Sequence, residues 1–115
     1  MDSAMHITFR DIPSSPAVEE RIRESYEKLI RHHNDITSCR VVVSAPHRHQ
    51  HKGRTYQINI DLVLPGGELV VNRDHGSDQS HEDVYIAIRD AFGAAERQLK
   101  EYNQRLHHKV KAHAN

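Results

Sequence analysis

Residues 56–71, which read YQINIDLVLPGGELVV, decide the fold. Apolar and polar side chains alternate over Tyr56–Leu64, which is the period of a β-strand with one buried face. Pro65-Gly66-Gly67 then has the composition of a tight turn, and Glu68–Val71 is suited to a returning strand. This stretch therefore predicts an antiparallel hairpin.

Two further strands are predicted on the N-terminal side of this hairpin. Apolar and polar residues alternate over Met5–Phe9, which predicts a short strand. Ile36–Ala45 is rich in β-branched residues and is followed by Pro46, so we expect a strand that ends there. Cys39 lies in the middle of this strand, and we favour a small buried core residue over a reactive thiol.

Two helices complete the pattern. Ser15 and Pro16 have the residue types of an N-cap and a first helical position, and apolar residues then recur at helical spacing to about His33. A second helix is predicted from about His81 to about His108, with Ser80 and Asp83 as a capping box. Its apolar stripe, with spacings of three and four, comprises Tyr85, Ile88, Phe92, Ala95, Leu99, Tyr102 and Leu106.

The predicted order β-α-β-β-β-α corresponds to an α+β fold with a four-stranded mixed sheet. The helix between the first two strands makes them parallel, and the later pairs are antiparallel. Each helix has one apolar stripe, so both are expected to pack on the same face of the sheet and to leave its other face exposed. The 115 residues suit a single domain, with residues 1–4 and 109–115 as loose tails.

Composition excludes several classes of protein. The chain has 16 Lys and Arg against 16 Asp and Glu, so any nucleic-acid binding must come from a local patch and not from bulk charge. Its apolar runs are too short for a membrane-spanning helix, and no signal peptide is visible. A single cysteine cannot form an intrachain disulfide, which fits a reducing, cytoplasmic setting.

No motif in the sequence predicts an enzyme or a cofactor. Glu82 and Asp83 are adjacent acids, but acids at a helix N-terminus are explained by the helix dipole. Pro65-Gly66-Gly67 is a hairpin turn and not a phosphate-binding loop. We therefore expect no catalytic residues, no cofactor and no small-molecule substrate.

Two basic segments are the candidates for binding. Residues 47–54 read HRHQHKGR, in which six of the eight are His, Lys or Arg. His47, His49 and His51 alternate and are candidates for a metal site such as zinc, although a basic loop that contacts phosphate explains them as well. A second basic cluster runs from Arg97 to His113, and a solvated helix end, where cations suit the helix dipole, explains it equally well.

These features together resemble the ribosome hibernation-promoting factors, a family also known as ribosome-associated inhibitors and sigma-factor modulation proteins. The resemblance covers about Met5 to Leu106. It rests on the element order, on Lys28-Leu29, on the Pro65-Gly66-Gly67-x-Leu69 hairpin, and on Asp83-x-Tyr85-x-Ala87-Ile88 followed by Arg97-Gln98-Leu99. The sequence is identified as a divergent short form, without the C-terminal dimerisation domain of long members.

The resemblance implies a bacterial, cytoplasmic, non-enzymatic factor with a fold similar to a double-stranded-RNA-binding domain. Such a factor binds the small ribosomal subunit and its ribosomal RNA, blocks translation and preserves idle ribosomes in stress or stationary phase. It has no membrane partner, and its oligomeric state stays open. The expected RNA-binding residues, from the resemblance and the basic segments, are Lys28, Arg31, Arg48, Lys52, Arg54, Arg97, Lys100 and Arg105.

The chain departs from the family pattern at several positions. The family commonly has lysine at Ser25 and Ala94, and Glu101 and Asn103 dilute the basic run that follows Gln98-Leu99. We therefore expect less RNA-facing charge on the helices, with part of it displaced to residues 47–54. An alternative of a different class is a small metal-responsive or protein-interaction module that uses the His47–His51 segment on the same fold.

Overall fold

The computed structural model describes the backbone of residues 4–49, 53–72 and 83–113, and side chains within residues 4–45, 55–72 and 83–105. In chain order, these residues form β1 (Ala4–Arg10), α1 (Pro16–His32), β2 (Ser38–His49), β3 (Gly53–Leu64), β4 (Gly67–Asn72) and α2 (Val84–His113). The predicted order β-α-β-β-β-α is confirmed. No helix in the described part of the chain is both long and apolar enough to span a membrane.

The sheet has the strand order β1-β2-β3-β4. As predicted, β1 runs parallel to β2, and the other two neighbouring pairs are antiparallel. The register places one apolar row across all four strands, formed by Ile7, Val41, Ile60 and Val71. The last three of these side chains have no exposed surface, so this row is the centre of the core.

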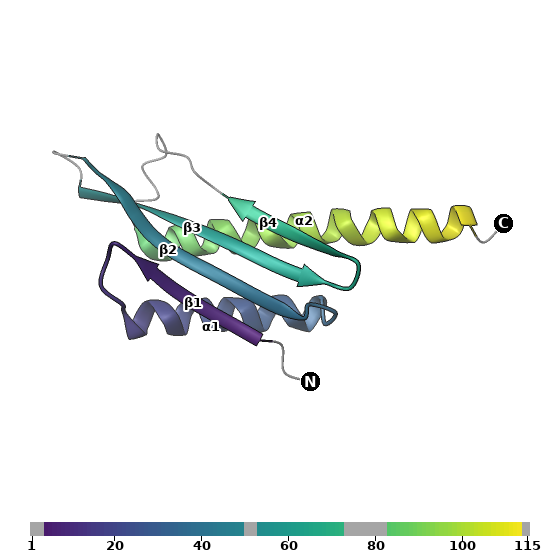
Figure 1. Cartoon of the computed structure of the whole chain (residues 1–115), viewed down its shortest axis with the longest axis horizontal. Coiled ribbons are helices and arrows are strands. Elements are labelled where there is room, and N and C mark those ends of the chain that lie inside the picture. Colours follow the sequence, from purple (N-terminus) through teal and green to yellow (C-terminus); the bar gives the residue numbers. More distant parts are fainter. Residues whose placement is uncertain (1–3, 50–52, 73–82, 114–115) are drawn as a thin grey trace.

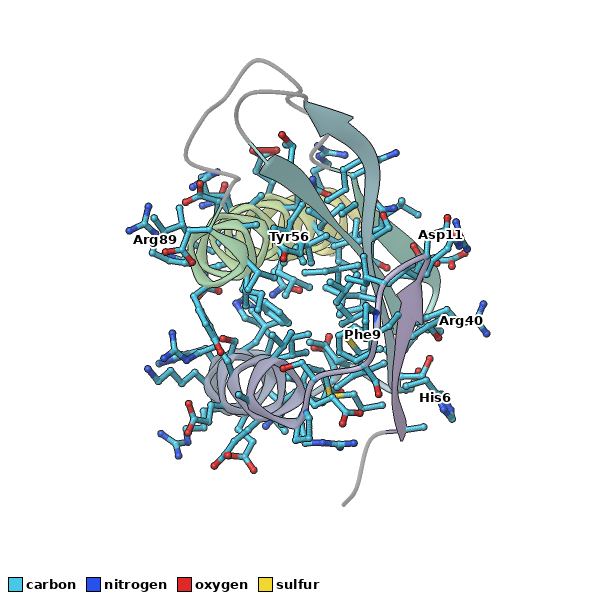
Figure 2. The ribbon with its side chains drawn as sticks, turned by 90° about the vertical axis from the view of Figure 1, so that its left-hand side faces the viewer. His6, Phe9, Asp11, Arg40, Tyr56 and Arg89 are labelled. Atoms are coloured by element: carbon cyan, nitrogen blue, oxygen red, sulfur yellow. The ribbon has the colours of Figure 1, made fainter. Side chains whose placement is uncertain are left out.

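Both helices cover the same face of the sheet (Figure 1). In Figure 2 the labelled side chains of Phe9 and Tyr56 lie between the sheet and the helix layer. His6 and Arg40 project from the opposite face of the sheet, away from the helices. The prediction of one covered face and one exposed polar face is therefore confirmed.

The predicted end of the second strand at Pro46 is wrong. Ser44 pairs with Gln57, but the next pair is His47 with Thr55, so two residues of β2 lie opposite one residue of β3. Such a bulge accommodates a proline, because the extra residue does not need to donate a ladder hydrogen bond. β2 and β3 consequently extend into the basic segment, to His49 and from Gly53.

The first helix begins as its sequence predicts. The Ser15 hydroxyl accepts a hydrogen bond from the backbone N–H of Val18 at 3.3 Å, and Pro16 occupies the first turn. The apolar stripe of α1 is buried at Val18, Ile22, Tyr26 and Leu29.

The second helix begins later and ends later than predicted. It starts at Val84, and the Asp83 carboxylate accepts a hydrogen bond from the Tyr85 N–H at 2.9 Å. Asp83 is thus the N-cap itself and not the third helical residue of a capping box; Ser80 lies outside the described residues. The helix continues to His113, so the expected tail at 109–115 is helical through most of its length. Likewise, Ala4 belongs to β1 and not to a loose start.

Candidate nucleic-acid interface

A groove of about 560 Å³ lies between α1 and α2 on the helix layer. Side chains three or four positions apart share one flank of a helix, and one flank of each helix lines the groove. The α1 flank comprises Arg21, Ser25, Lys28 and His32. The α2 flank comprises Tyr85, Arg89, Gly93 and Glu96.

The groove has an apolar floor and a cationic rim. The floor is formed by Leu29, Ile88 and Phe92, which are all buried in the core. The rim includes the exposed side chains of Lys28 and Arg89. Figure 2 shows Arg89 pointing away from the sheet, on the outer side of the helix layer. The groove therefore combines apolar surface with positive charge on the face opposite to the open sheet.

Arg21 and Tyr85 join the two helices at one end of the groove. The Arg21 guanidinium carbon lies 4.9 Å from the centroid of the Tyr85 ring, which is cation–π distance. Arg21 is also 3.8 Å from the Glu24 carboxylate one turn away, at an exposed position where such a pair contributes little. The stacked pair thus presents a flat cationic surface beside the groove.

His33 joins the two helices at the other end. It is the C-cap residue of α1 and only 6% exposed. Its Nε2 is hydrogen-bonded to Oε2 of Glu96, and the side-chain amide of Asn103 donates to its Nδ1 at 3.2 Å. Because Nδ1 accepts, the ring proton is on Nε2 and points to the Glu96 carboxylate. The bond ties α1 to α2 beside the cations of the rim.

Three of the predicted RNA-binding residues lie at or beside the groove. Lys28 lines it directly. The Arg97 guanidinium lies over Gly93, with Nη1 at 3.8 Å from the position of a Cβ on that glycine. Lys100 follows Glu96 by four positions and so shares its flank of α2. Among the described side chains, none of these three cations makes an ion pair, which leaves their charge available to a partner.

Two other predicted residues are placed differently. Arg31 is exposed but does not line the groove. Arg105 is 3.6 Å from the Glu101 carboxylate, so an acid partly neutralises its charge. The helical spacing places Arg105 on the other flank of α2 from Glu96 and Lys100.

The remaining predictions fall on the β2–β3 end of the sheet. Arg48 and Arg54 are register partners in the β2–β3 pair, with their side chains outside the described part. Lys52 and His51 lie outside the described residues altogether, and the side chains of His47 and His49 lie outside them as well. Within the residues that the structure describes, no three His, Cys, Asp or Glu side chains are grouped to hold a metal. The metal site at His47, His49 and His51 stays a prediction.

Two departures from the family pattern have structural explanations. Ala94 is 4% exposed, so this position packs in the core and is not a phosphate contact that the chain has lost. Asn103 donates a hydrogen bond to His33, a contact that the longer and more flexible stem of lysine would not reproduce in the same geometry. Ser25, in contrast, lines the groove, and its hydroxyl donates to the Arg21 carbonyl at 2.9 Å.

Cys39 is the small buried core residue that the sequence predicts. It is 1% exposed, and burial, with a smaller contribution from the charge of Asp61, raises the pKa of its thiol to about 12. A thiol that stays protonated at neutral pH is a poor nucleophile.

The sequence analysis did not identify Arg21 and Arg89 as residues that line the groove, or His33 as a residue that joins the two helices. Glutamates are interleaved with the cations of α1, a pattern that by itself indicates mainly helix-surface pairs for Arg21. Its spacing to Ser25 and Lys28, four and then three positions, was the available signal for a shared flank. The pairing of that flank with Arg89 depends on how α1 packs against α2, which no local pattern contains.

Comparison with known proteins places these features in a family. The family model described as Sigma 54 modulation protein / S30EA ribosomal protein matches residues 5–107. A ribosome hibernation promoting factor of Acinetobacter guillouiae is 30% identical over 106 residues, covering 87% of this chain and 88% of the relative. A ribosome hibernation promotion factor of Deinococcus radiodurans is 26% identical over 84% of this chain, which spans about half (47%) of that relative's length.

Solved structures agree with the fold. A ribosomal subunit interface protein from Coxiella burnetii superposes with a TM-score of 0.70 at 15% identity, over 88% of this chain and 98% of that one. The N-terminal domain of Thermus thermophilus Protein Y gives a TM-score of 0.65 at 21% identity, over 88% of this chain and 99% of that domain. With the family model covering nearly the whole described fold, the chain belongs to the Sigma 54 modulation protein / S30EA ribosomal protein family.

Proposed function

We propose that this chain is a ribosome-associated factor that binds the small ribosomal subunit through its ribosomal RNA, inhibits translation by occupancy and preserves idle ribosomes under stress. It acts by binding and not by catalysis, in the cytoplasm of a bacterium. The names of its relatives, which are ribosome hibernation factors, support this proposal.

The observation that carries the proposal is a set of three cations, at or beside the interhelical groove, that make no ion pair with any side chain that the structure describes. Lys28, Arg97 and Lys100 come from both helices and are all exposed on the helix layer. Cations from two adjacent elements can contact successive phosphates of one RNA strand or both sides of an A-form groove. Such contacts fix position and supply affinity without reading the sequence of the RNA.

Co-sedimentation with bacterial ribosomes tests the proposal. The wild-type chain should sediment with the small subunit at low salt and be released as salt rises, because phosphate contacts release counterions. The triple variant Lys28→Ala, Arg97→Ala, Lys100→Ala should bind more weakly, with a logarithmic salt slope smaller by about 3.

A matched triple variant controls for net charge. Arg10→Ala, Arg23→Ala and Arg40→Ala remove the same charge from exposed positions away from the groove. Arg10 and Arg40 lie on the open sheet face, and Arg23 lies on the opposite flank of α1 from Arg21. Equal loss of binding in the two triple variants would contradict a localised interface, and no wild-type binding at low salt would contradict the function.

A further inference from the structure

We infer that the groove between α1 and α2 holds one unstacked RNA nucleotide, with its base on the apolar floor and its phosphate at the cationic rim. This inference rests on the proposed function and assigns a specific ligand to part of the surface described above. It differs from backbone contact because a base, and not only a phosphate, enters the groove.

The size and the lining of the groove favour a base. Its volume of about 560 Å³ lies within the range of small-molecule sites. Of its floor residues, Leu29 and Phe92 keep 4% and 7% of their surface exposed and Ile88 keeps none, and the half-buried side chains of Tyr85 and Ile86 add to the apolar lining. A surface that contacts only phosphates gains nothing from an apolar depression, since phosphates stay hydrated. A nucleobase has apolar faces that lose water when they are covered, so it is complementary to this floor.

Gly93 leaves the middle of the groove open. It lies on the groove-facing flank of α2, and a Cβ at this position would meet only the Arg97 guanidinium, at an ordinary contact distance of 3.8 Å. Glycine costs a helix interior about 1 kcal/mol relative to alanine, and no close packing requires its use here. Space for a ligand over this residue would explain why a glycine stands here in spite of that cost.

The charges of the groove fix the orientation of the nucleotide. Lys28 lines the rim without an ion pair among the described side chains and attracts a phosphate, whereas Glu24 at 3.8 Å and Asp90 at 3.2 Å partly neutralise Arg21 and Arg89 on the same rim. The Glu96 carboxylate repels a phosphate but accepts hydrogen bonds from base N–H groups. Its bond to His33 uses Oε2, and Oε1 has no hydrogen bond to another described residue. The phosphate therefore lies away from the Glu96 end of the groove.

The Arg21–Tyr85 pair supplies a stacking surface. A guanidinium plane and an aromatic ring are the two groups on which unstacked RNA bases most often stack. The guanidinium lies 4.9 Å from the ring centroid, so the two already form one layered wall at the edge of the groove. A base beside this wall would extend the stack and offset the energy lost when it leaves its RNA neighbours.

Filling the groove without changing its charge tests the inference. Gly93→Leu places an apolar side chain over the floor, whereas the control Gly93→Ala adds a single methyl group. Both substitutions favour the helix, so the fold is retained. Gly93→Leu should lower the affinity for ribosomes by about tenfold or more, and Gly93→Ala by less than about twofold. Equal affinity of Gly93→Leu and wild type would overturn the inference while leaving the proposed function intact.

A second measurement separates a base from a phosphate. Guanosine 5′-monophosphate and ribose 5-phosphate are titrated separately into the isotopically labelled wild-type chain, and the backbone amide resonances are followed by NMR. The nucleotide should shift the resonances of Tyr85, Phe92 and Gly93, and ribose 5-phosphate at the same concentration should not. Equal shifts from both compounds, or none from the nucleotide, would show that no base enters the groove. Failure of wild type to bind ribosomes, in contrast, would contradict the proposed function, and the NMR titration by itself would then decide whether a base enters the groove.

Discussion

The His33 imidazole and the Glu96 carboxylate are hydrogen-bonded across the interface of α1 and α2, although 63 positions separate them in the sequence. The bond joins the C-cap of α1 to a point near the middle of α2. Asn103 holds the other ring nitrogen, so the ring is fixed from two sides. Because Lys28 and Arg97 lie within about one helical turn of these residues, the bond sets the spacing of cations that belong to different helices.

We expect His33→Ala to destabilise the protein by about 1–3 kcal/mol. The substitution removes a buried ring and leaves Glu96 and Asn103 without their partner. Urea unfolding followed by circular dichroism measures the change as a lower midpoint with an unchanged slope.

Glu24→Ala is the matched control for this substitution. Like Glu96, Glu24 is a paired carboxylate. Its partner, however, is Arg21, which lies one turn away on the same helix at 3.8 Å, and the site is exposed. The effect of Glu24→Ala should stay within about 0.5 kcal/mol of wild type. A His33→Ala protein as stable as the Glu24→Ala protein would mean that the network is not a structural tie.

The fold could be predicted from local patterns because each element has a clear period. Alternation over residues 56–64 and the three-four spacing on α2 each identify an apolar face, and two such helices have only one way to cover one sheet face. The bulge at Pro46 could not be predicted, since the proline alone is typical of a strand end. The start of α2 was misplaced because Ser80 and Asp83 are both good N-cap residues, and the local sequence does not decide between them.

The site was harder to predict than the fold. Lys28 and Arg97 could be identified from residue type and family resemblance, but their proximity to one groove depends on the packing of α1 against α2. His33 is one of 11 histidines in the chain, and its partners Glu96 and Asn103 lie on another helix. Its burial therefore has no local signature. Ala94 shows the converse, because the resemblance predicts an RNA-facing lysine at a position that is 4% exposed here.

Cys39 should react with a thiol reagent only after unfolding. Burial raises the pKa of this thiol from 9.0 to about 12, so the folded protein holds almost no thiolate at pH 8. We expect labelling by Ellman's reagent to be at least about 100-fold slower in buffer than in denaturing urea.

The same pKa makes the stability depend on pH at the alkaline end. The unfolded thiol releases its proton near pH 9, and the folded thiol does so only near pH 12. The free energy of unfolding should therefore fall as pH rises through this window. Cys39→Ala should show a smaller decline than wild type over the same range, and identical declines would argue against the raised pKa.

Gly67→Ala should destabilise the β3–β4 hairpin. A Cβ at this position would lie 2.7 Å from the Tyr102 hydroxyl and 3.2 Å from Cε1 of its ring, so the tyrosine would have to move. The hydroxyl donates to the Pro65 carbonyl at 3.4 Å, and that bond would be lost as well. We expect a loss of about 1–3 kcal/mol in urea unfolding.

A double-mutant cycle identifies the cause of that loss. In a Tyr102→Ala background, the alanine at position 67 meets no ring, so Gly67→Ala should cost less than half as much there. The same cost in both backgrounds would place the effect in the backbone of Gly67 and not in its contact with Tyr102.

Lysine substitutions at Ser25 and Ala94, the two positions where the resemblance predicts lysine, should have opposite outcomes. Ser25→Lys adds a cation at the rim of the groove, at a half-exposed position, and should strengthen ribosome association at low salt by up to about fivefold with little change in stability. Ala94→Lys puts an ammonium group at a position that is 4% exposed, and should destabilise the protein by about 1–3 kcal/mol without strengthening association. Co-sedimentation measures the ribosome association of both variants, and urea unfolding measures their stability. A stable Ala94→Lys protein with higher affinity would contradict the prediction, because this flank of α2 would then take part in ribosome binding as well.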